Sequence, residues 1–152
     1  MALKASFFRI ENDLDVAPGS LIRQGTDWLI RAKIDDRHEK ADVALCLTGE
    51  QLGQFSYIFD PSRCVALDPT LKLELRVEGI IEGPGGAVIG SLVWSGTSQA
   101  ICAKDGFFIT MAGESSKDFS GLRTFFARNW SIWAVDETGR EIGSGPLVVV
   151  SA

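Results

Sequence analysis

The clearest repeating pattern in the chain is the run LKLELRV at residues 71–77, where apolar and charged residues alternate. Successive side chains of a β-strand point to opposite faces, so a period of two predicts a strand with one face in a core and the other in water. The charged residues of the run should therefore be solvated. The apolar residues expected to line the core are Leu71, Leu73, Leu75 and Val77.

The run WLIRAKI at residues 28–34 alternates more loosely, with Trp28, Ile30, Ala32 and Ile34 on one side and Arg31 and Lys33 on the other. Other apolar runs of strand length contain many β-branched and aromatic residues, which favour strands. These runs lie at residues 43–48, 55–59, 87–94, 99–103, 107–111, 130–135 and 146–150.

Glycine and charged residues separate these runs as turns do. Gly139 stands where a hairpin loop over residues 136–140 requires a positive φ, and residues 104–106 form a similar joint. Residues 82–86 (EGPGG) can form neither a helix nor a central strand. The mostly charged residues 35–42 should form a solvated loop.

The sequence of one segment is compatible with two secondary structures. Ser115 and Asp118 have the spacing of a capping box, which predicts a helix over residues 115–128. The alternative is a loop that leads into a strand over residues 123–136. With many short strands and at most one short helix, we predict a single all-β domain over residues 1–152, either an antiparallel β-sandwich or a flattened β-barrel.

Composition narrows the range of partners. Hydrophobic residues make up 45% and charged residues 23% of the chain, which excludes a disordered or coiled-coil protein. The net charge of −5 provides no long-range attraction to nucleic acid or to anionic membranes, so neither is an expected partner. Apolar runs fall short of a signal peptide or of the ~18 residues of a membrane span, which predicts a cytoplasmic location.

Residue types that commonly bind metals or act in catalysis are scarce. The three cysteines, Cys46, Cys64 and Cys102, are too widely spaced for a zinc motif, and the apolar settings of Cys46 and Cys102 predict buried, inert thiols. The single histidine, His38, lies in the most hydrophilic segment and should be exposed. We therefore expect no metal site and no cofactor.

Paired carboxylates are another possible source of catalysis. Glu74, Glu78 and Glu82 recur at a spacing that suits one strand face, but that face should be solvated, whereas an acid catalyst needs partial burial. The glycine-rich residues 79–86 lack the lysine and hydroxyl residue of a phosphate-binding loop. The sequence singles out no catalytic residue, and a small carboxylate-dependent hydrolase stays a second alternative.

The four tryptophans are the remaining candidates for a binding surface, and all lie in predicted strands. Trp130 and Trp133 are three residues apart, so they should face opposite sides of their strand unless a bulge intervenes. Aromatic side chains outside a core suit sugars, apolar ligands or protein partners. We expect ligand or partner contacts at Trp94, Trp130 and Trp133.

These patterns favour a non-enzymatic binding or interaction module on a β-sandwich. A β-barrel with a small apolar ligand in an internal cavity is the first alternative. Self-association is part of the hypothesis, because residues 130–135 and 147–150 are apolar on both faces and Pro146 suits an edge strand. We expect a homodimer or other homo-oligomer whose contact includes Trp133 or residues 147–150.

Overall fold

The computed structural model describes residues 4–152, which form an all-β fold of antiparallel strands. Its helical content is limited to two 3-10 turns, η1 (Ala5–Phe7) and η2 (Lys104–Gly106). No helix of the described residues is long and apolar enough to cross a membrane. The prediction of an all-β, sandwich-like fold is confirmed.

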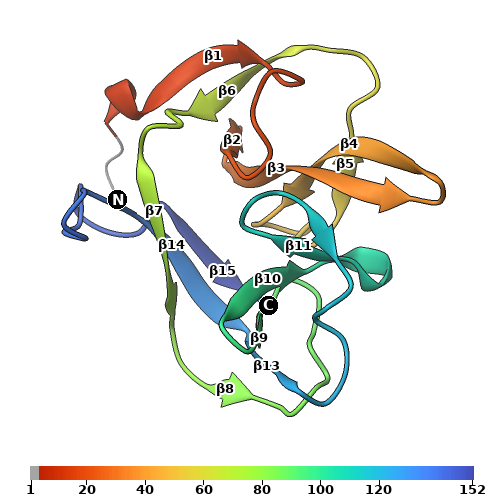
Figure 1. Ribbon diagram of the computed structural model, residues 1–152. Helices are drawn as coiled ribbons and strands as arrows, with labels where there is room; N and C mark the ends of the chain where they lie inside the picture. The colour runs from red at the N-terminus through yellow and green to blue at the C-terminus, as the bar shows by residue number, and fades with distance from the viewer. Residues whose placement is uncertain (1–3) are drawn as a thin grey trace.

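The first sheet has six strands and lies at the top and right of Figure 1. Its longest element is a hairpin whose two strands stay in register from the pair Leu29–Cys46 to the pair Asp36–Glu39, with the turn between them. The spatial order of the sheet is β1 (Phe8–Asn12), β6 (Arg63–Leu67), β2 (Leu21–Gln24), β3 (Asp27–Asp36), β4 (Glu39–Cys46) and β5 (Phe55–Tyr57).

Two further sheets complete the fold (Figure 1). The second sheet has the order β12 (Ser115–Ser116), β11 (Phe108–Thr110), β10 (Ser98–Cys102), β9 (Leu92–Ser95), β13 (Thr124–Ala127) and β8 (Ile81–Glu82). The third sheet has the order β15 (Val148–Ser151), β14 (Asn129–Val135) and β7 (Lys72–Val77).

All three sheets contribute to one large apolar core. Trp28 comes from the first sheet, Ile101 from the second and Trp130 from the third, and each is at most 3% exposed. The buried indole of Trp130 donates a hydrogen bond to the carbonyl oxygen of Gly90 at 2.9 Å. The core therefore holds this polar N–H group without leaving it unpaired.

The first two sheets also meet through close backbone contact at two glycines. The amide of Lys33 donates to the carbonyl of Gly113, and the amide of Gly19 donates to the carbonyl of Arg31, both at 2.7 Å. A Cβ atom on Gly113 would collide with the backbone nitrogen of Gly19 and the carbonyl oxygen of Arg31. Only glycine allows these three segments to approach so closely.

The strand predicted at residues 71–77 is confirmed with one correction. Leu71, Leu73 and Leu75 are half-buried and pack against the core, as predicted. Val77 does not line the core and is 37% exposed. It ends β7, which is an edge strand of the third sheet, so no neighbouring strand covers it on that side.

Two other expectations need correction, and the alternative left open at residues 115–128 is decided. Residues 35–42 form the paired ends of the β3–β4 hairpin instead of a loop, although His38 in its turn is exposed as predicted. Of the two alternatives for residues 115–128, the structure has the loop that leads into a strand, although the strand is interrupted at Arg128, where the chain passes from β13 in the second sheet to β14 in the third. The strand expected at residues 87–94 begins only at Leu92.

Candidate functional site

The first sheet has a second apolar face, on the opposite side from the large core. Strand alternation directs Ile22, Leu29, Ala44 and Cys46 to this face, and each is at most 7% exposed. Val16, from the loop between β1 and β2, packs among them. Both faces of the sheet are therefore partly apolar, as in a sheet that is covered on each side.

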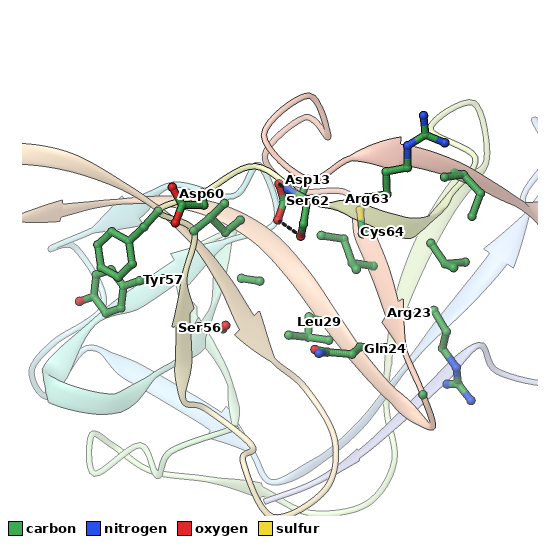
Figure 2. Close-up of a pocket in the computed structure, with 17 residues that line it drawn as sticks. Asp13, Arg23, Gln24, Leu29, Ser56, Tyr57, Asp60, Ser62, Arg63 and Cys64 are labelled. Atoms are coloured by element: carbon green, nitrogen blue, oxygen red, sulfur yellow. Dashed lines mark hydrogen bonds between the residues drawn. The ribbon is translucent and has the colours of Figure 1, made fainter.

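Residues 58–62 connect β5 to β6 within this sheet, and a groove of about 630 Å³ opens between them and the second face. Ile22, Leu29 and Ala44 line its floor. In Figure 2, Ser56 lies on the left, Leu29 and Gln24 further right, and Ser62 and Cys64 along the top. The groove thus collects side chains from all six strands of the first sheet.

A neighbouring hollow of about 490 Å³ continues the groove toward the start of β3. The two hollows share Gln24, Leu29 and Ser56, and the second adds Gln51 and Gln54. Within residues 4–152, these three glutamine amides and the Ser56 hydroxyl form no side-chain hydrogen bond. Neutral donors and acceptors therefore remain free along an apolar floor.

Several charged groups around the groove are already engaged by the protein. Asp13 accepts hydrogen bonds from the amide and the hydroxyl of Ser62, at 3.0 and 3.3 Å. Asp27 accepts one from Thr48 at 3.1 Å. The guanidinium of Arg23 lies 4.8 Å from the ring centre of Trp28. These contacts hold the walls in place and leave fewer charges available to a ligand.

Arg31, which the sequence places on the side of its strand opposite Trp28 and Ile30, is 1% exposed on this same face. Its guanidinium pairs with Asp42 at 2.7 Å and donates to the backbone carbonyl of Asp13 at 3.1 Å. It thereby ties the loop after β1 to the centre of the sheet. A buried charge is tolerated because it is paired and hydrogen-bonded, so the role of Arg31 is structural.

Two thiols line the groove, Cys64 in the main hollow and Cys46 in its continuation. Burial raises the pKa of the Cys64 thiol, and the carboxylates of Asp13 and Glu11 raise it further. Burial also raises the pKa of Cys46. A thiol with a raised pKa is protonated at neutral pH and is a poor nucleophile, so these groups serve as apolar lining.

The structure does not bring the three candidate tryptophans together, and none of them lines the groove. Trp130 is a core residue with 0% exposure. Trp133 faces the other side of β14, as predicted, where its indole donates to Ser131 at 2.8 Å and the guanidinium of Arg76 lies 4.3 Å from its ring centre. Trp94 stacks on Phe125 with ring centres 5.3 Å apart. Ligand contact at these residues stays a prediction.

The carboxylates singled out in the sequence are each engaged separately. Glu74 pairs with Arg76 and Glu82 with Arg128, both at 2.8 Å, and Glu78 accepts a hydrogen bond from Ser131 at 2.8 Å. None of the three lines the groove. The buried positions of Cys46 and Cys102 are confirmed.

Sequence reasoning missed the groove because its lining carries no motif. Aliphatic side chains, serine and glutamine are common in any strand, and only the strand order brings them together. Comparison of the chain with protein-family models, with curated proteins and with solved structures finds no match.

Proposed function

We propose that the protein is a non-enzymatic binding module whose binding site is the groove on the second face of the first sheet. The observation that carries the proposal is the combination of a buried aliphatic floor with free amide and hydroxyl groups at its rim. Ligand sites typically combine an apolar lining with a few polar groups in a hollow of about 300–1,000 Å³. The groove meets this description.

The free groups favour a small ligand without net charge. Gln24, Gln54 and Ser56 offer neutral donors and acceptors, while Asp60 and Arg63 at the mouth carry one charge of each sign. The proposal keeps the small ligand of the barrel hypothesis but moves it from an internal cavity to the outer face of a sheet. Cytoplasmic location stays a prediction.

The test is an NMR screen of the full chain against a library of uncharged fragments. We expect binding fragments to shift the amide signals of Ile22, Leu29, Ala44 and Cys64, since these residues line the groove. Fragments that shift signals elsewhere, or a library without any binding fragment, would contradict the proposal.

A matched pair of variants tests whether the fragments bind in the groove. Ser56→Phe places a ring in the groove, whereas Ser98→Phe makes the same change at an exposed strand position of the second sheet. Ser56→Phe should weaken fragment binding by about tenfold or more, and Ser98→Phe should leave it unchanged. Equal binding by both variants would overturn the assignment of the site.

A further inference from the structure

Two stacked aromatic rings lie exposed at the end of β5, on the rim of the groove. The ring centres of Tyr57 and Phe59 are 5.8 Å apart and their planes differ by 9°. Phe59 is 83% exposed and Tyr57 is 41% exposed. In Figure 2 the Tyr57 ring lies to the left of Ser56, away from Leu29 and Cys64. The ring pair thus forms part of the groove's outer rim and lies apart from its aliphatic floor.

Carboxylates without an ion-pair partner lie near these rings. The Tyr57 hydroxyl makes a long hydrogen bond of 3.5 Å to Asp36, and Asp60 follows Phe59 in the chain. Burial raises the pKa of the Tyr57 phenol, and the negative charges of Asp36 and Asp105 raise it further. Within residues 4–152, none of these three aspartates forms an ion pair.

The third sheet contains a similar group of one aromatic ring and two carboxylates, and there an arginine of the chain is bound. There the guanidinium of Arg76 lies 4.3 Å from the ring centre of Trp133 and forms ion pairs with Glu74 at 2.8 Å and Glu141 at 2.6 Å. An aromatic face and two carboxylates together enclose one arginine. In the described part of the chain, the Tyr57–Phe59 pair has the ring face and the carboxylates, but no cation of the chain lies over it.

We propose that the Tyr57–Phe59 pair, with Asp36, Asp60 and Asp105, binds an arginine side chain of a partner protein. The faces of aromatic rings attract cations, and a planar guanidinium can stack on Phe59 while its N–H groups reach the carboxylates. The net charge of −5 adds a long-range attraction to a basic segment. The two rings lie on the rim of the groove, so this interaction does not require a ligand on the groove floor.

The experiment uses the only tyrosine of the chain as its reporter. Selective 13C labelling of tyrosine gives ring signals from Tyr57 alone, and these are followed during titration with the peptide acetyl-Gly-Arg-Gly-amide. The control peptide carries citrulline, which has nearly the same shape as arginine but no charge. We expect a saturable shift with the arginine peptide and none with the citrulline peptide. Equal shifts, or no shift at about 10 mM peptide, would overturn the proposal.

Single substitutions test which residues form the arginine site. Phe59→Ala removes a ring that contributes little to folding because it is exposed, and it should weaken arginine binding by about fivefold. Asp36→Asn should weaken it as well. Phe125→Ala removes a partly exposed stacked ring on the second sheet and should leave binding unchanged, as should Gln24→Ala in the groove. Binding that survives Phe59→Ala, or is lost in Phe125→Ala, would contradict the proposed site.

Discussion

Gly113 shows how a single missing side chain permits two sheets to meet. Its φ is +77°, and a Cβ atom there would collide with the backbone of Gly19 and Arg31. We expect Gly113→Ala to lower the free energy of unfolding by about 3 kcal/mol, measured by urea unfolding with tryptophan fluorescence.

The control for Gly113 is Gly106, which has a similar φ of +75° but open space around its Cα. Gly106→Ala should cost only the backbone strain, about 1 kcal/mol. Equal losses in the two variants would mean that the positive φ alone, and not the close contact between the sheets, explains the need for glycine at position 113.

Arg31 marks the limit of prediction at the level of single residues. The alternation of residues 28–34 assigns Arg31 correctly to the face opposite Trp28 and Ile30. It does not reveal that the loop after β1 covers this face, because that contact joins segments 18 residues apart. The burial of Arg31 therefore depends on a contact with a distant loop, which no local sequence pattern reveals.

Strands with strong patterns were predictable, and weakly patterned ones were not. Continuous or alternating apolar runs predicted β3, β4, β7, β10 and β14. The strand β1 reads FRIEN, and its alternation of apolar and polar residues is only five residues long and is not matched by burial, since Ile10 is 61% exposed. It is held as a strand by pairing with β6, and the groove was unpredictable for the same reason, since it depends on which strands pair.

The strand β7 allows the core assignment to be tested at the level of one element. Leu73 packs against the core, whereas Val77 in the same strand is 37% exposed. We expect Leu73→Asp to destabilise the protein by about 3 kcal/mol or to cause aggregation, because it places an unpaired charge against apolar neighbours. Val77→Asp should cost less than about 1 kcal/mol. A normal melting temperature for Leu73→Asp would contradict the packing of β7 described above.

At the scale of the whole molecule, the edge strands of the sheets differ in how well they are protected from pairing with another chain. The edge strand β7 carries Lys72, Glu74 and Arg76, and β8 and β12 are only two residues long. Charges and short length both hinder pairing with another chain. The edge strand β15 has neither protection, since it reads VVVS and Val149 is 57% exposed.

This difference refines the expected homodimer. Trp133 is half-buried beneath Arg76, so a contact through residues 147–150 is favoured over one through Trp133. We predict that two copies pair their β15 edges antiparallel, which would join two three-stranded sheets into one of six strands. Light scattering at micromolar concentration should give the mass of a dimer, and Val149→Lys should convert it to a monomer. Val77→Lys, the matched change on the opposite edge of the sheet, should leave the dimer intact. A monomeric mass for the natural chain, or a dimer that tolerates Val149→Lys, would rule out this mode of association.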